Sequence, residues 1–248
     1  MSEENQSPGM ETEFFGADDS FRFDCHQGLA CFGQCCRDIN IFLTPNDVIR
    51  LKIKLGISST GFLRAYTELL EVPGLKFPFI YLKMNEGDLQ CPFVTSTGCS
   101  VYQERPWSCR MAPVDIAGPG MFKFAFDRQK CLGLNCEKEW TVRQWTGSQD
   151  MDCYDNVEAT FKEIPFLVKF TGEDFLDKRI AGLFKLVCFD IDGFRQFALK
   201  NKRLIREGGG LPGISGNLKD DVSLLKAGIH WFINVAANKK VLKKVHGF

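Results

Sequence analysis

Apolar residues recur at helical spacing in the stretch that contains Val48, Leu51 and Leu55. Thr44 precedes this stretch and suits an N-cap, and Pro45 suits the first helical position. Asp47 comes three residues after the cap, where its carboxylate can reach back to the backbone, and Gly56 can end the helix. The pattern therefore predicts a helix from Pro45 to about Leu55.

A second helical pattern begins after Ser58 or Ser59, either of which can act as the N-cap. Its apolar positions are Phe62, Leu63, Tyr66, Leu69 and Leu70. The Pro73-Gly74 pair stops the pattern, because neither residue continues a helix well. The sequence thus predicts a second helix that extends through Leu70.

Two segments have the character of strands. Residues 76–84 are rich in aromatic and aliphatic side chains, and Pro78 places them at an edge, because proline cannot donate a hydrogen bond within a sheet. Residues 121–127 alternate between apolar and polar positions, with Phe122, Phe124 and Phe126 on one face. This alternation predicts a strand.

From about residue 137 the pattern becomes that of amphipathic helices. We expect one to open near Trp140 and others to cover 155–163, 173–188, about 191–206 and about 218–238. The glycine-rich segment from Glu207 to Gly216 separates the last two and is expected to be a flexible loop.

These elements predict an α+β fold with a division near residue 136. Residues 21–136 are expected to form a small cysteine-rich metal-binding domain with short strands and helices. Residues 137–248 are expected to form a mainly helical region packed on it. Residues 1–20 are polar and acidic, and we expect them to form a flexible tail.

Composition supports an ordinary packed core. The chain has 248 residues, of which 44% are hydrophobic and 23 are phenylalanine, so disulfides are not needed for folding. The first residues lack the basic and apolar character of a secretory signal, and no apolar run approaches the length of a membrane span. We therefore expect a cytoplasmic protein without a membrane partner, whose eleven cysteines do not form a disulfide framework.

The charges balance overall but not along the chain. The chain has 31 basic and 31 acidic residues; residues 1–24 carry seven acids and one arginine, and residues 195–248 carry eleven basic residues and three acids. No basic motif interleaved with aromatic residues accompanies this asymmetry, so solvated helix faces explain it better than a nucleic-acid interface.

Clustered cysteines carry the chemistry of the sequence. Four thiols lie within the twelve residues from Cys25 to Cys36. The nine candidate metal ligands are Cys25, Cys31, Cys35, Cys36, Cys91, Cys99, Cys109, Cys131 and Cys136. Thiolates are soft anionic ligands, so such a cluster suits zinc or an iron–sulfur cluster rather than magnesium or calcium.

The spacing favours iron–sulfur chemistry modestly over zinc. Zinc sites usually draw on C-x₂₋₄-C knuckles, which only Cys31-x₃-Cys35 and Cys131-x₄-Cys136 offer, whereas a [4Fe-4S] or [2Fe-2S] cluster tolerates looser spacing. The side chains of the neighbours Cys35 and Cys36 are expected to diverge and to serve different metals or different irons of one cluster. One of them then joins Cys25 and Cys31, and the other joins the second group, Cys91, Cys99 and Cys109, while Cys131 and Cys136 form a third pair.

Other residues have weaker signals. Arg105 and Arg110 flank Cys109 and could offset thiolate charge, or serve as ordinary surface arginines. His26 is a ligand candidate by position only. Cys188 lies on an apolar helical face and is expected to be a core residue, and Cys153 is undecided.

Enzyme motifs are missing from the sequence. The chain has neither the C-x₃-C-x₂-C signature of radical adenosylmethionine enzymes nor a G-x-G-x-x-G dinucleotide fingerprint. None of the three histidines has a clear helper for a cysteine nucleophile. No catalytic residue can therefore be assigned from the sequence.

Several motifs together resemble the YkgJ-type cysteine-cluster family, a zinc- or iron-chelating domain. The resemblance covers roughly residues 20–136 and is carried by the cysteine loop, Leu43-Thr44-Pro45-Asn46-Asp47, Cys91-Pro-Phe, Cys99-Ser-Val-Tyr and Arg105-Pro-Trp-Ser-Cys109-Arg110. The compact form of the family motif is C-x₂-C-x₂-C-C, whereas this chain has C-x₅-C-x₃-C-C.

The resemblance implies a bound metal. It also implies the label of iron–sulfur oxidoreductase, but no reaction is agreed for the family, so the sequence does not decide whether this chain is an enzyme. The leading expectation is iron–sulfur or zinc binding with a role in electron transfer or redox sensing. A structural zinc module for a protein partner is one alternative. A protein-modifying enzyme with an auxiliary cluster is another, because flagellin lysine methylases contain a similar cysteine cluster.

Overall fold

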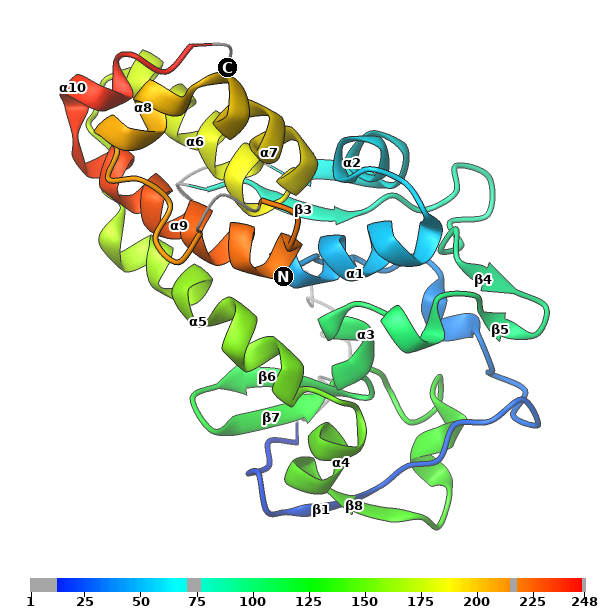
Figure 1. Ribbon diagram of the computed structural model, residues 1–248. Coiled ribbons are helices and arrows are strands. Elements are labelled where there is room, and N and C mark those ends of the chain that lie inside the picture. Colours follow the sequence, from blue (N-terminus) through cyan, green and yellow to red (C-terminus); the bar gives the residue numbers. More distant parts are fainter. Residues whose placement is uncertain (1–12, 71–76, 215–217, 247–248) are drawn as a thin grey trace, which may run out of the picture. The chain divides into compact units, whose positions relative to one another are not determined.

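The computed structural model describes residues 13–70, 77–214 and 218–246 (Figure 1). The chain forms two compact units, each built from two separate stretches of sequence. The first unit contains the described residues up to Cys35 together with Arg110–Asp150, and the second contains Cys36–Cys109 and the described residues from Met151 onward. Helices and short antiparallel strands occur together, which confirms the expected α+β class.

These units differ from the division that we expected near residue 136. Strand β8 (Glu139–Thr141) pairs antiparallel with β1 (Ser20–Arg22), so the segment after residue 136 joins the N-terminal part of the chain. Residues 36–109 belong instead with the C-terminal helices. The difference arises because strand pairing joins segments that are far apart in sequence.

The first unit is built on short strand pairs and one short helix. Besides β1 and β8, it contains the antiparallel pair β6 (Val114–Gly118) and β7 (Met121–Phe124), the 3-10 helix η3 (Leu132–Asn135) and α4 (Val142–Ser148). Phe23 packs edge-on against Trp145, whose indole N–H donates to the carbonyl of Met111. Both aromatic rings are buried, and their contact joins the segment before the cysteine loop to α4.

The second unit is mainly helical. Its helices are α1 (Pro45–Leu55), α2 (Ser59–Tyr66), α5 (Asp152–Leu167), α6 (Asp174–Cys188), α7 (Ile191–Lys200), α8 (Lys202–Glu207), α9 (Asp221–Ala237) and α10 (Lys239–Leu242). Its strands pair as β2 (Thr67–Leu70) with β3 (Phe79–Leu82) and β4 (Val94–Thr95) with β5 (Gly98–Cys99). Helix α9 contacts α1, α5, α6 and α7 (Figure 1) and supplies the centre of the core.

Two short helices carry candidate ligands at the points where the chain passes between units. The 3-10 helix η1 (Gln34–Cys36) contains both neighbouring cysteines, and α3 (Trp107–Met111) contains Cys109. The division of the chain therefore falls between Cys35 and Cys36, and again directly after Cys109.

The first predicted helix is confirmed with its caps. The Thr44 hydroxyl accepts from the Asp47 N–H while the Asp47 carboxylate accepts from the Thr44 N–H, which completes a capping box. Gly56 ends α1 in the left-handed region with φ of 66°, where a side chain would be strained.

The second predicted helix is correct at its start and wrong at its end. Ser58 caps α2 as expected, but α2 ends at Tyr66, and Leu69 and Leu70 lie in β2. Pairing with β3 gives their backbone groups partners outside the helix, which local spacing cannot reveal. Residues 71–76, including the expected Pro73-Gly74 stop, lie outside the described residues.

Other predicted elements were confirmed in part. The strands expected at 76–84 and 121–127 are present as the shorter β3 and β7, and Phe126 lies beyond β7. Helices α5, α6 and α9 match three predicted helices. The helix expected to open near Trp140 is α4, which begins at Val142, although Trp140 itself lies in β8. The helix expected over 191–206 is divided at Asn201 into α7 and α8.

The expected tail extends over residues 1–20, of which the first twelve lie outside the described residues. Beyond them, Phe15 forms a backbone bridge with Phe122, and Ser20 already belongs to β1. In the described part of the chain, no helix combines the length and apolar character that crossing a membrane requires.

Candidate metal centre

The first group of thiols lies in the first unit and consists of Cys25, Cys31, Cys35 and Cys131. The first three follow β1 in a loop of tight turns, in which the Gln34 N–H donates to the Cys31 carbonyl. The Asp24 N–H donates to the carbonyl of Gly133, which anchors the start of this loop to η3. Cys131 directly precedes η3, so this anchor brings the two cysteine segments together.

The thiols of this first group interact through their charges. The pKa of Cys25 is raised to about 11, mostly by burial and then by the nearby thiols of Cys35, Cys131 and Cys31. The pKa of Cys131 is raised by burial and then by Cys31 and Cys35. Because each thiolate disfavours the others, a bound cation would relieve the repulsion of all four.

The second group of thiols lies in the second unit and consists of Cys36, Cys91, Cys99 and Cys109. The Cys91 N–H donates to the Cys36 carbonyl at 2.8 Å, next to the backbone bridge between Arg37 and Gln90. Cys99 ends the β4–β5 pair, and Cys109 lies in α3. Cys91 is part of the hydrophobic core, and the other three pack against it, so this group is less accessible than the exposed Cys25 and Cys35.

Charge interactions also link the members of the second group. Burial raises the pKa of Cys109 far above its usual value, and the thiols of Cys91 and Cys99 and the Asp47 carboxylate raise it further. The Arg105 guanidinium opposes the rise in the pKa of both Cys99 and Cys109, which supports the expected charge-offsetting role of this arginine. Arg110 instead donates to the carbonyl of Gln149 in the first unit.

The donor chemistry of both groups fits zinc or iron, which thiolates bind readily. Among the described residues, however, no three histidine, cysteine, aspartate or glutamate side chains converge closely enough to hold a metal ion as they stand. A metal bound by either group would therefore require its thiols to move closer together. Such tightening upon binding is expected when metal affinity and loop folding are coupled.

The structure describes three of the four remaining sequence candidates. His26 Nδ1 accepts from the Gly28 N–H at 3.1 Å, so this nitrogen is already in use. Cys136 lies at the far end of η3, with its Sγ 3.9 Å from the Leu132 carbonyl. Cys188 is buried in the core at the end of α6, as expected, and the side chain of Cys153 lies outside the description.

Sequence reasoning missed a buried network beside the second group. The Asp47 carboxylate, which also caps α1, accepts from the Trp107 N–H of α3 and from the Tyr154 hydroxyl of α5. Burial raises the pKa of Asp47 to about 6, although these hydrogen bonds lower it. The sequence revealed the capping role of Asp47, but no local signal connects it with Trp107 or Tyr154.

A second buried carboxyl, that of Glu158, lies near Asp47. Glu158 is 4% exposed, and its Oε1 has no hydrogen-bond partner among the described residues. Burial raises its pKa to about 7, the Thr44 hydroxyl opposes this shift, and the Asp47 charge adds to it. Because the folded state binds this proton more tightly, the contribution of Glu158 to stability declines as the pH rises through about 7.

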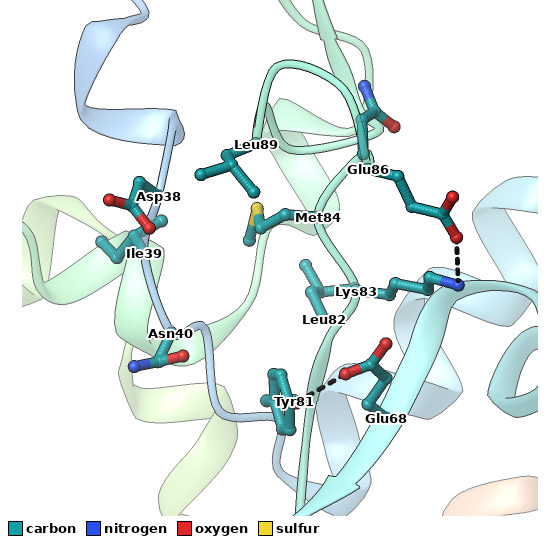
Figure 2. A pocket seen from close by; sticks show the side chains of 11 residues that line it. Asp38, Ile39, Asn40, Glu68, Tyr81, Leu82, Lys83, Met84, Glu86 and Leu89 are labelled. Carbon is teal, nitrogen blue, oxygen red and sulfur yellow. Dashed lines mark hydrogen bonds and ion pairs between the residues drawn. The ribbon is translucent and has the colours of Figure 1, made fainter.

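A pocket of about 300 Å³ opens in the second unit (Figure 2). The apolar side chains of Ile39, Met84 and Leu89 gather toward one end, and the Tyr81 hydroxyl donates to Glu68 at the other. The pocket thus combines an apolar wall with a polar one.

The pocket wall and the second group share two chain segments. Asp38, whose N–H donates to the Leu89 carbonyl at 2.8 Å, lines the pocket two residues after Cys36. Leu89 likewise precedes Cys91 by two residues. A molecule in this pocket would therefore contact residues that are only two positions away in sequence from the candidate ligands Cys36 and Cys91.

Substitution of Cys188 tests whether this cysteine is a core residue or a metal ligand. We expect Cys188→Ala to lower the free energy of unfolding by about 1 kcal/mol, because it removes a small buried group. Metal content should stay unchanged, since burial raises the pKa of this thiol and keeps it neutral. Denaturant unfolding and elemental analysis check both points; the loss of one metal equivalent would make Cys188 a ligand.

Comparison with known proteins identifies the cysteine-rich part of the chain. Residues 24–143 match the model of the family CxxCxxCC, described as "Putative zinc- or iron-chelating domain". The chain has no significant match among curated proteins or among solved structures. The matched segment contains all eight thiols of the two groups described above. Residues 24–143 of this chain are therefore similar to the cysteine-cluster family of zinc- or iron-chelating domains.

Proposed function

We propose that this protein binds two metal centres, each held by four thiolates and each formed within one unit. The first centre uses the first group, Cys25, Cys31, Cys35 and Cys131. The second centre uses the second group, Cys36, Cys91, Cys99 and Cys109. In this assignment the neighbours Cys35 and Cys36 serve different centres, and Cys136 is left outside both.

One observation carries this proposal: the thiols that influence one another fall into two groups. The pKa of Cys25 is raised by Cys35, Cys131 and Cys31, whereas that of Cys109 is raised by Cys91 and Cys99. Cys36 joins the second group through its backbone bond to Cys91. The division of the chain between Cys35 and Cys36 supports the same assignment.

We propose that iron–sulfur clusters or zinc fill these centres. An iron–sulfur cluster would supply one-electron redox chemistry, and zinc would supply structural cross-linking. The exposed thiols of the first centre favour exchange of electrons with a partner, in electron transfer or redox sensing. The second centre packs against the core and favours a structural role.

Metal analysis of serine variants tests the proposal. Protein purified without oxygen should contain two centres, detected as zinc or as iron with acid-labile sulfide and visible absorption. Cys31→Ser and Cys99→Ser should each lose one centre, and the double variant should lose both, because three thiolates hold a metal far more weakly than four.

Cys136→Ser is the matched control, since it removes a thiol of the first unit that lies outside the proposed ligand set. It should keep both centres. Wild-type protein without zinc or iron would overturn the proposed function, and loss of the same centre in Cys31→Ser and Cys99→Ser would overturn the division into two. Zinc without sulfide would select the structural alternative over the redox role.

A further inference from the structure

We infer that Asp47 and Tyr154 are positioning residues for the second centre, although neither is a ligand. Together they hold the turn at residues 105–107, which carries Arg105 on one side and leads into Cys109 on the other. This inference rests on the proposed function and adds to it the residues that shape one of the two centres.

Asp47 connects three elements through one buried carboxylate. Asp47 is fully buried, and its Oδ2 accepts from the Thr44 N–H of the α1 cap at 2.8 Å. Its Oδ1 accepts from the Trp107 N–H at 2.9 Å and from the Tyr154 hydroxyl at 2.8 Å. The carboxylate thereby joins the start of α1 to the start of α3 and to α5.

The same pair reaches the other side of the turn. The Tyr154 hydroxyl, whose single proton goes to Asp47, also lies 3.4 Å from the Arg105 carbonyl, so the pair contacts the backbone on both sides of Pro106 and bonds it at Trp107. Cys109 follows in the first turn of α3, only two residues beyond the Trp107 N–H. A shift of this turn would therefore move Cys109 relative to Cys91 and Cys99.

Arg105 gains its position from the same turn. Its guanidinium donates to the Tyr102 carbonyl at 2.7 Å and lies over the Tyr102 ring at 3.9 Å. From there its positive charge lies near the thiols of Cys99 and Cys109 and would offset part of the negative charge that the two ligands bring to a metal centre. The Asp47 and Tyr154 pair thus positions both the ligand Cys109 and the positively charged Arg105.

Electrostatics alone would give Asp47 the opposite effect. Its negative charge raises the pKa of Cys109 and so disfavours the thiolate that binds metal. If charge were its main influence, Asp47→Asn would strengthen metal binding. If position dominates, the same substitution weakens it, because the amide cannot accept all three hydrogen bonds.

Cobalt titration of the second centre distinguishes the two outcomes. The parent protein is the full chain with Cys31→Ser, so that only the second centre binds. In this parent we expect Asp47→Asn to weaken cobalt binding 10- to 100-fold and Tyr154→Phe about 10-fold, as loss of outer-shell support does elsewhere. The thiolate-to-cobalt absorbance per bound cobalt should also fall, because Cys109 no longer ligates fully.

Tyr81→Phe is the matched control. It removes a phenolic hydroxyl that donates to a carboxylate elsewhere in the second unit, at 2.6 Å from Glu68, and should leave binding and spectrum unchanged. If Asp47→Asn does not fold, Tyr154→Phe alone decides the matter, since it retains the buried ring.

Each remaining outcome is decisive. Unchanged affinity, tighter binding by Asp47→Asn, or weaker binding with the parent absorbance per bound cobalt would overturn the positioning role while leaving two centres in place. A parent that binds no cobalt would overturn the proposed second centre itself, and this inference with it.

Discussion

Removal of metal from the intact protein should release the cysteine segments while the helical core of the second unit stays folded. We expect amide hydrogen exchange to become rapid at residues 25–37, 91–109 and 127–136, and α6 and α9 to keep their protection. The physical reason is that a structural metal contributes its binding free energy to folding only where its ligands lie. Helix α9 lies in the hydrophobic core and contains no cysteine, so its packing does not depend on a metal ligand of its own.

The thiols themselves explain why these segments depend on metal. Burial raises the pKa of Cys25 to about 11 and that of Cys109 further, so both are neutral in the metal-free protein near pH 7. A neutral thiol offers only a weak hydrogen bond, and the segments then lose their cross-links. A structural zinc site is worth about 10–16 kcal/mol in small peptides, which makes this the largest expected effect.

Hydrogen exchange and thermal melting, measured without oxygen before and after chelation, check this expectation. Restoring the metal should restore protection, which separates metal loss from thiol oxidation. Identical melting curves and identical protection in the two states would contradict a structural role for either centre.

Asp192→Ala should lower the free energy of unfolding by about 3 kcal/mol, because it breaks a largely buried charge network. The Asp192 carboxylate accepts from Lys52 Nζ at 2.9 Å and from the Ser59 N–H at 2.8 Å, and it also pairs with Arg195. Asp221 pairs with the same two basic side chains, so four charges link α1, α7 and α9. Removing one acid leaves Lys52, whose side chain is 10% exposed, with half of its compensation.

The effect should depend on pH in a defined direction. Burial alone would raise the pKa of Asp192, but the hydrogen bonds from Ser59, Lys52 and Arg195 lower it to about 2 from 3.8. A carboxyl with a lowered folded-state pKa stabilises the protein above its unfolded pKa and loses that contribution as the pH falls. The difference between wild type and Asp192→Ala should therefore be full above about pH 4 and shrink toward pH 2.

Denaturant unfolding at several pH values measures this difference. Glu86→Ala serves as the control, because its ion pair with Lys83 is exposed and should contribute less than about 0.5 kcal/mol. Equal destabilisation by the two substitutions would show that burial adds nothing to the Asp192 network.

Local sequence signals determined several elements of this fold. The Thr44 cap, the Asp47 capping box and Gly56 set the bounds of α1, and apolar spacing located α6 and α9. Each of these signals acts between residues three or four positions apart, so it can be read along the chain. The density of thiols likewise indicated metal chemistry, because ligand type depends on the side chain itself.

Contacts between distant residues decided the rest. Leu69 and Leu70 continue a helical pattern, yet pairing with β3 places them in a strand, and pairing of β1 with β8 groups residues 139–141 with the N-terminal part of the chain. Tyr154 reaches Asp47 across 107 positions without any local sign of doing so.

The grouping of the thiols likewise depends on contacts between distant residues that the sequence does not reveal. The sequence by itself predicted that Cys35 and Cys36 should diverge, since neighbouring side chains usually point in different directions. Only the tertiary structure decided that Cys35 lies with Cys131 and Cys36 with Cys91, because the backbone hydrogen bonds that join these segments form between groups that every residue carries.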